Sequence, residues 1–384
     1  MLRSGDRVRI NVQLIQAGMD KRLWSNSYEG DLRDVFALQA GVARKIADEI
    51  RVTLTPPERA RLSRVRASNP DAYQAYSKGR FFWNKRTEEN LKKAIGFFQQ
   101  AVDKDPDYAL AYDGLADSWI GLGWWGYLSP SETFPHAKVA VTRALSLDDS
   151  LAEAHASLAL VNLYYDRDWA GAEREFRRTI DLNPNYASAH NWYGEFLSLV
   201  GRYKQAISES ERARVLDPLS SIINALVGSR YFFARQYDKA IEECRNAVEM
   251  DPNFGPARMF LGQAYEQKGM LQEAIAEFER AMSLAGGSSV YAASLAHAFG
   301  VAGRRAEALK VLEDLRKMAG IRFVSSYDLA LVYVGLGDNA KAFELLNAAA
   351  QERSPRVVCL GVEPRFDGLR ADPRFTELLR SVGL

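Results

Sequence analysis

The sequence predicts an all-α fold, a right-handed superhelix of about eight helix pairs, with a small truncated α/β element at its N-terminus. Two observations predict the superhelix. An alanine recurs every 34 residues through the second half of the chain, and a proline recurs with the same spacing. A period of this length holds two helices and their turns, and such units must stack on one another to bury their apolar faces.

The repeat combines small and large residues in a fixed register. A small residue lets one helix lie close against the next, and a large residue three or four positions away fills the remaining space. The recurring alanines are Ala94, Ala137, Ala172, Ala206, Ala240, Ala274, Ala308 and Ala342, of which the last six are 34 residues apart. Large apolar residues stand four positions after several of them, at Phe98, Phe176, Phe278, Leu312 and Leu346.

Glycine and proline mark the ends of the predicted helices. Proline cannot continue a helix, so Pro184, Pro218 and Pro252 separate successive units. Glycines are expected to end the first helix of a unit in the left-handed conformation at Gly201, Gly269, Gly303 and Gly337. These signals divide the array into units at 75–108, 109–151, 152–186, 187–220, 221–254, 255–288, 289–322 and 323–356.

The period and the small/large code resemble those of the tetratricopeptide repeat family. Five successive spacings of 34 residues between alanines favour this interpretation over an ordinary helical bundle, in which a chance pattern would drift. We therefore expect a tetratricopeptide array over residues 67–356 and a capping segment over 357–384. The sequence from Asp372 to Val382 is typical of a capped amphipathic helix that shields the last apolar face, as repeat arrays require.

The second unit carries an insertion that contains Trp124, Trp125 and Tyr127. Exposed paired tryptophans often mark a contact site, so this loop is one candidate for partner binding. The alternative is that the three rings fold back and pack against the array. Substitution of both tryptophans by alanine separates these interpretations, because only packed rings stabilise the fold.

Residues 1–66 do not repeat. Val8, Ile10, Val12 and Leu14 alternate with polar residues, which predicts a half-buried strand, and Lys21–Tyr28 is the expected return strand. The apolar residues that follow share one face of a predicted helix: Val35, Leu38, Val42, Ile46 and Ile50.

This N-terminal segment resembles the latter half of the TolB-like domain. That domain precedes tetratricopeptide arrays in bacterial signalling proteins, behind winged-helix, nucleotide-cyclase or protein-kinase domains. The first strand and helix of the domain have no counterpart here, so we expect a partial domain and a truncated or alternatively started chain. An open strand edge could then pair with another copy and form a homodimer.

Composition and motifs argue against catalysis and against nucleic-acid binding. The chain has 50 Lys+Arg and 49 Asp+Glu, so it lacks the strong positive charge that nucleic acid or an anionic membrane attracts. Phosphate-binding loops, nucleophile elbows and zinc-protease motifs are missing from the sequence. His155 and His190 occupy equivalent points of neighbouring units, where packing is a better explanation than a shared metal. We predict a protein that is not an enzyme and has no cofactor.

The predicted binding surface is the concave groove that the first helices of the units line. Large aromatic side chains and methionine suit the capture of an apolar or extended segment. Family geometry would point eight side chains into the groove: Asn191, Trp192, Glu195, Phe232, Phe233, Met259, Phe260 and Gln263. The alternative is that these residues pack between units.

The predicted function is therefore a non-catalytic protein-interaction module, the sensory or regulatory part of a bacterial signalling protein. Its expected partner is a protein or peptide, with no nucleic acid bound by this chain alone and no membrane segment. A second interpretation is the regulatory C-terminal region of a fused nucleotide cyclase, protein kinase or winged-helix regulator. The two cysteines are far apart, which favours a reducing, cytoplasmic location.

Overall fold

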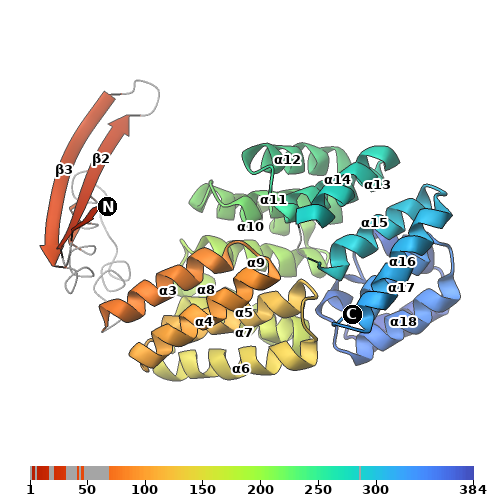
Figure 1. The fold of residues 1–384 in the computed structure, drawn as a ribbon, viewed down its shortest axis with the longest axis horizontal. Coiled ribbons are helices and arrows are strands. Elements are labelled where there is room, and N and C mark those ends of the chain that lie inside the picture. Colours follow the sequence, from red (N-terminus) through yellow and green to blue (C-terminus); the bar gives the residue numbers. More distant parts are fainter. Residues whose placement is uncertain are drawn as a thin grey trace.

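The computed structural model describes residues 2–4, 7–16, 21–31, 41–42, 45–46, 69–284 and 287–384. Residues 69–351 form eight antiparallel helix pairs, as the repeat predicts, and the pairs stack into a curved array (Figure 1). The helices, in order, are α3 (Pro70–Trp83), α4 (Glu88–Lys104), α5 (Ala109–Trp124), α6 (Pro130–Leu147), α7 (Ala152–Val161), α8 (Trp169–Leu182), α9 (Ala187–Leu199), α10 (Tyr203–Leu216), α11 (Ser221–Phe233), α12 (Tyr237–Met250), α13 (Gly255–Gln267), α14 (Leu271–Leu284), α15 (Ser289–Val301), α16 (Arg305–Ala319), α17 (Ser326–Gly335) and α18 (Asn339–Gln351).

The predicted unit boundaries agree with the helix pairs except at the first unit. Helix α3 begins at Pro70, five positions before the predicted boundary, because Asn69 caps it. The Asn69 side chain accepts hydrogen bonds from the amides of Asp71 and Ala72, and Pro70 occupies the first helical turn. In the third unit, α7 continues as a single π-helical turn, η2 (Asn162–Asp166).

The turn between the two helices of a unit requires a left-handed residue. Gly201, Gly269, Gly303 and Gly337 have φ angles between 73° and 77°, which confirms their predicted role. Three other units place an arginine at this point, since Arg86, Arg167 and Arg235 have φ angles of 59°, 59° and 63°. A non-glycine residue in this region costs about 1–2 kcal/mol, so these arginines must be stabilised by other contacts.

Close helix packing depends on the glycines in the helix interiors. The ring of Phe98 on α4 lies between Gly79 of α3 and Gly114 of α5, and a Cβ atom on either glycine would come within 2.6 or 2.5 Å of that ring. In later units Gly262 lies in the same way against Phe278. The small residues therefore set how closely successive helices approach, and hence the curvature of the array.

The last part of the chain folds into the cap that the sequence predicts. Helix α19 (Pro373–Ser381) begins at Asp372, whose side chain accepts a hydrogen bond from the amide of Arg374. Two short 3-10 turns precede it, η3 (Pro355–Cys359) and η4 (Pro364–Leu369). Phe366 and Phe375 are almost completely buried, so the cap shares a core with the eighth unit.

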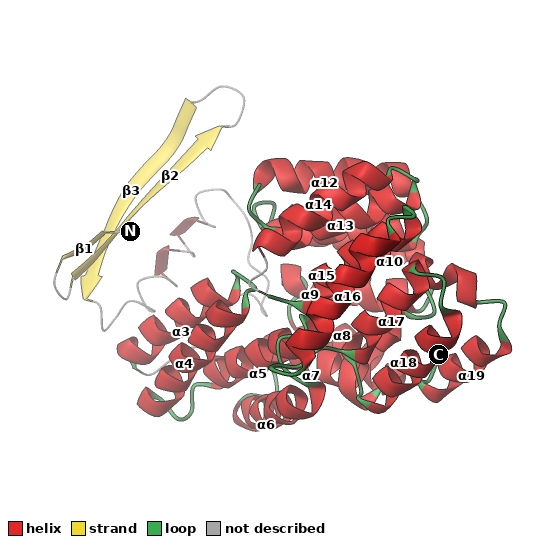
Figure 2. Cartoon of the chain, turned by 45° about the vertical axis from the view of Figure 1, so that its right-hand side comes forward, coloured by secondary structure: helices red, strands yellow, loops and turns green. Residues whose placement is uncertain are grey.

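The N-terminal residues form a three-stranded antiparallel sheet in the order β1 (Leu2–Ser4), β2 (Arg7–Gln16) and β3 (Lys21–Asp31). The predicted pair of strands is present, with Ile10 opposite Tyr28 and a register shift between Leu14 and Ile15. Figure 2 shows the sheet to one side of the helical array. The predicted helix through Val35–Ile50 falls mostly outside the described residues, and only the short stretches 41–42 and 45–46 of it are described as helical.

The array curves far enough for its late units to touch its early ones. The Ser288 hydroxyl donates to the backbone carbonyl of Trp125 at 2.7 Å, and the Trp125 ring stacks on Tyr291 of α15 at 6.2 Å between centroids. The guanidinium of Arg322, at the end of the seventh unit, pairs with Glu88 at the start of α4. These contacts join residues far apart in the chain and close the concave side.

The left-handed arginines bind the end of the array and the cap to the early and middle units. Arg167 donates to the carbonyl of Ala350 at 2.6 Å. Arg235 makes two bonds to the Asp367 carboxylate, at 2.7 and 2.9 Å. Such charge-assisted and bidentate bonds offset the backbone strain of these residues.

We expect Gly114→Ala to lower the free energy of unfolding by about 1–3 kcal/mol, because the added methyl group overpacks the site of Phe98. Gly96→Ala is the matched control. Gly96 lies in the interior of α4 with no atom within 4 Å of an added Cβ, so alanine there should raise stability by up to about 1 kcal/mol. Denaturant unfolding of both variants measures the difference. Equal effects would contradict the role of Gly114 in helix approach.

Candidate functional site

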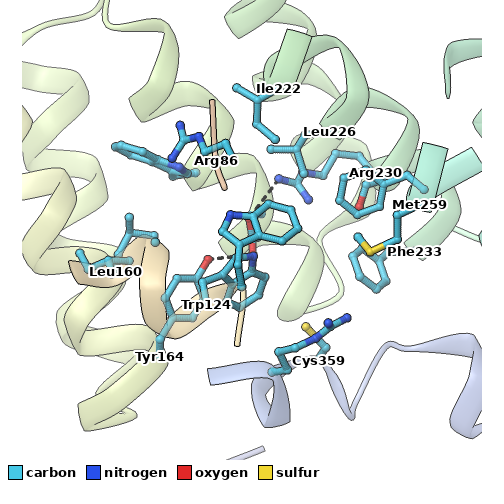
Figure 3. A pocket seen from close by; sticks show the side chains of 18 of the residues that line it. Arg86, Trp124, Leu160, Tyr164, Ile222, Leu226, Arg230, Phe233, Met259 and Cys359 are labelled. Carbon is cyan, nitrogen blue, oxygen red and sulfur yellow. Dashed lines mark hydrogen bonds and ion pairs between the residues drawn. The ribbon is translucent and has the colours of Figure 1, made fainter. Parts of the chain in front are cut away.

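A cavity lies on the concave side of the array, where the first helices of units two to six face the cap. Its volume is about 100 Å³. Its wall comes from the end of α3, from α5, α7, η2, α9, α11 and α13, and from the segment around η3 (Figure 3). The cap therefore completes a cavity that the repeats alone would leave as an open groove.

Aromatic rings form much of the wall. Trp124 stacks on Tyr164 with ring centroids 4.5 Å apart, and both side chains line the cavity. Further half-buried rings come from Trp192, Phe233 and Phe260. The aliphatic part of the lining consists of Ile120, Leu160, Ile222, Leu226 and Met259. This lining suits an apolar group.

A buried polar cluster lies among these rings. Arg230 is only 1% exposed, and its Nη2 lies 3.4 Å from both the Glu195 carboxylate and the Asn191 carbonyl. Glu195 also accepts a 2.8 Å hydrogen bond from the Tyr164 hydroxyl. Burial lowers the pKa of Arg230, although Glu195 and Tyr164 oppose this shift. The Nε atom of Arg230 is buried and has no hydrogen-bond partner among the described residues.

Arg86 enters the cavity from the turn after α3. Its guanidinium lies over the ring of Trp83, 3.3 Å from the centroid, and its buried Nε atom has no hydrogen-bond partner within the described part of the chain. Burial lowers the pKa of Arg86 to about 9, and Arg80 adds to that shift, while Asp117 opposes it. Asp117 itself bonds Arg80 at 2.7 Å.

The cap contributes Arg356, Cys359 and Glu363 to the lining. Glu363 accepts two bonds from the buried Arg365, at 2.9 and 3.0 Å, and Arg356 lies 3.9 Å from Asp328. Burial raises the pKa of the Cys359 thiol above its usual range. That thiol is therefore a poor nucleophile.

The structure brings together six of the eight residues predicted for the groove. Trp192, Glu195, Phe233, Met259, Phe260 and Gln263 line the cavity. The other two, Asn191 and Phe232, are not part of the lining and are buried, 2% and 1% exposed. Each immediately precedes a lining residue, and one step along a helix turns a side chain by about 100°.

The insertion loop belongs to the fold rather than to an exposed surface. Trp125 and Tyr127 are 6% and 1% exposed, and the Tyr127 hydroxyl donates to the carbonyl of Arg86 at 3.2 Å. Trp124 is half-buried and faces the cavity. An exposed contact loop was thus the wrong interpretation, and the alternative, that the rings pack back on the array, describes this segment.

The two equivalent histidines stabilise their units. In His155 and His190, one ring nitrogen bonds a glutamate of the next helix, Glu175 or Glu209, at 2.7 and 2.6 Å, and the other bonds a backbone carbonyl. Burial lowers the pKa of both rings, but these bonds outweigh it, so that the net shift is upward. The described residues contain no group of three or more potential metal ligands.

The three arginines and the other cap residues of the cavity were not predicted from the sequence. Arg86 had a usable signal, since it replaces the glycine that other units place at the same turn. Arg230 follows the helix-packing Gly228 by two positions, but nothing in the repeat marks it as buried. The contribution of Arg356, Cys359 and Glu363 depends on how the cap folds back.

We expect Trp125→Ala to lower the free energy of unfolding by about 3–5 kcal/mol, because it removes a buried indole that contacts α15. Phe81→Ala is the control, since Phe81 is 59% exposed and its loss should cost much less. Urea unfolding monitored by circular dichroism measures both. A Trp125→Ala effect no larger than that of the control would mean that the insertion does not stabilise the closed array.

Comparison with known proteins supports the repeat assignment. Three family models described as tetratricopeptide repeat match residues 175–208, 234–298 and 294–356. A search of solved structures finds a monomeric mutant of IFIT1 with a TM-score of 0.52 and 16% identity, covering 82% of this chain and 76% of that one. At this identity, the likeness supports the fold alone. The described residues include no helix that is both long and apolar enough to cross a bilayer.

Two curated relatives match part of the chain. Putative adenylate cyclase 3 of Rhizobium meliloti is 28% identical over 160 residues, which is 41% of this chain and 27% of the cyclase. The transcriptional regulator HilA of Salmonella typhimurium is 24% identical over 148 residues, 38% of this chain and 27% of HilA. The matched part is thus about a quarter of the length of each relative.

Proposed function

We propose that this tetratricopeptide-repeat chain, which resembles the C-terminal regions of bacterial regulators, binds a polypeptide segment in its concave cavity and so serves as the regulatory part of a signalling protein. The repeats support the coarser statement, a protein-protein interaction module. The observation that carries the finer proposal is the aromatic and aliphatic lining of the cavity, to which four of the residues predicted from the sequence contribute, namely Trp192, Phe233, Met259 and Phe260.

The size and shape of the cavity favour a short anchor over a long extended strand. Ligand cavities of about 300–1,000 Å³ surround most of a drug-sized molecule. This cavity, at about 100 Å³, is smaller. The cap covers part of the concave side through Arg356 and Cys359. A partner would therefore insert one or two side chains, and the rest of its contacts would lie at the rim.

We also propose that binding is the whole activity of the chain. A catalytic carboxylate needs a free lone pair and a substrate proton within reach. The lining carboxylates Asp117, Glu195 and Glu363 instead accept hydrogen bonds from neighbouring side chains. The buried thiol of Cys359 is poorly ionised.

The second candidate is the regulatory C-terminal region of a fused effector, either a nucleotide cyclase, a protein kinase or a winged-helix regulator. The partial matches to an adenylate cyclase and to a transcriptional regulator favour this candidate. An immunoblot of the source cells with an antibody to the repeats separates the two. A band at the mass of this chain supports a separate module, while a much larger band supports a fused effector.

Three further expectations belong to the same proposal. We place the chain in the cytoplasm, where both described cysteines, which are unpaired, would remain thiols. We propose that this chain alone binds no nucleic acid. A homodimer through the sheet would use β1 or β3, since β2 is paired on both sides.

A peptide display library tests the proposed function. Peptides enriched on the purified chain should bind Phe233→Ala at least tenfold more weakly, because Phe233 is a half-buried ring of the cavity wall. Phe81→Ala is the matched control, since Phe81 is exposed and is not part of the lining. Enriched peptides that bind both variants equally, or no enrichment at all, would contradict groove binding. Circular dichroism confirms that both variants are folded.

A further inference from the structure

We propose that the cavity selects a carboxylate attached to an aromatic body, with Arg86 and Arg230 binding the carboxylate and the rings of Trp124 and Trp192 packing against the aromatic group. The carboxylate has two possible sources, a free small molecule or an acidic residue beside an aromatic one in a polypeptide. The polypeptide source rests on the proposed function, and the small-molecule source does not.

The acidic side chains of the cavity already have hydrogen-bond partners. Asp117 bonds Arg80, Glu195 bonds Tyr164, and Glu363 bonds Arg365, with heavy-atom distances of 2.7, 2.8 and 2.9 Å. A cationic ligand would have to compete with these bonds. A hydrogen-bond donor that enters the cavity therefore meets carboxylates that already accept hydrogen bonds from the protein.

Two arginines of the cavity, in contrast, have N–H groups that lack a hydrogen-bond acceptor in the part of the chain that the structure describes. Arg230 is buried, yet its contacts with Glu195 and Asn191 are long, 3.4 Å each, and its Nε atom has no partner among the described residues. The buried Nε atom of Arg86 has no hydrogen-bond partner among the described residues, and its guanidinium rests on the face of Trp83. A buried donor without an acceptor costs about 1–3 kcal/mol, and a ligand that supplies the acceptor recovers this free energy.

A carboxylate matches these donors in geometry as well as in charge. A guanidinium presents a planar fork of N–H groups that can donate to both oxygens of one carboxylate. Arg86 and Arg230 reach the cavity from different elements, the turn after α3 and helix α11 (Figure 3). Arg356 adds a third positive charge to the lining. Its guanidinium lies 3.9 Å from the Asp328 carboxylate.

The aromatic rings beside these donors indicate the apolar part of the ligand. Trp124 stacks on Tyr164, and its side chain lines the cavity. Trp192, half-buried, is another large ring of the same lining. Offset or edge-to-face contacts between aromatic rings contribute about 0.5–1.5 kcal/mol beyond the burial of apolar area. An aromatic carboxylate therefore uses both parts of the lining at once.

The test compares N-acetyl-tryptophan with N-acetyl-tryptophanamide by calorimetric titration of the full chain. The two probes share one body and differ in the negative charge. We expect the acid to bind at least tenfold more tightly than the amide. Arg86→Gln should abolish this preference and leave binding of the amide unchanged.

Arg235→Gln is the matched control, because Arg235 occupies the same kind of left-handed turn but bonds Asp367 outside the cavity lining. It should retain the preference for the acid. Equal binding of acid and amide, absence of binding by both, or an unchanged preference in Arg86→Gln would overturn the proposal. Arg230→Gln gives a second measurement, and it too should weaken binding of the acid more than that of the amide.

Two capped tetrapeptides distinguish the sources, N-acetyl-Gly-Glu-Trp-Gly-amide and its Gln counterpart. Tighter binding of the Glu peptide, dependent on Arg86, supports a polypeptide source and both proposals. A charge preference for N-acetyl-tryptophan with no binding of either peptide supports the small-molecule source and contradicts the proposed function. Equal binding of both peptides leaves the proposed function standing and overturns the selection of a carboxylate.

Discussion

The close approach of helices at small residues is the constraint on which the rest of the structure depends. Phe98 fits between α3 and α5 only because Gly79 and Gly114 present no side chain to its ring. Equivalent contacts recur along the array, as at Gly262 and Phe278. Since each contact fixes the angle between neighbouring helices, the repeated contacts fix the curvature of the whole array. That curvature brings the seventh and eighth units back to the first three.

Closure turns a groove into a cavity and explains why arginines occupy strained turns. A glycine at the turn between paired helices would be free of strain, and four units use one. Arg167 and Arg235 adopt the strained left-handed conformation. Their side chains bind Ala350, at the end of the array, and Asp367, in the cap. Arg86 instead rests its guanidinium on Trp83 and lines the cavity, and its buried Nε atom has no hydrogen-bond partner within the described residues. The same turn position thus stabilises closure in two units and places an arginine in the cavity lining in a third.

The sequence allowed prediction of what repeats and little of what does not. The alanine register, the left-handed glycines and the unit boundaries follow from local packing, which recurs with the period of the chain. Six groove residues were predictable because the repeat fixes which helix face is concave. Asn191 and Phe232 do not line the cavity, but each lies one position before a residue that does. Contacts such as that of Trp125 with Tyr291 join distant units and occur only once, so the repeat pattern does not predict them.

A double-mutant cycle between Trp125 and Tyr291 is the most direct test of contact between the late and early units of the array. The free energies of unfolding of the wild type, Trp125→Leu, Tyr291→Leu and the double variant give the coupling between the two rings. Stacked aromatic pairs are coupled by about 0.5–1.5 kcal/mol, and closure predicts a coupling in this range. Effects that add within about 0.3–0.5 kcal/mol are typical of residues that do not touch, and such additivity would contradict closure.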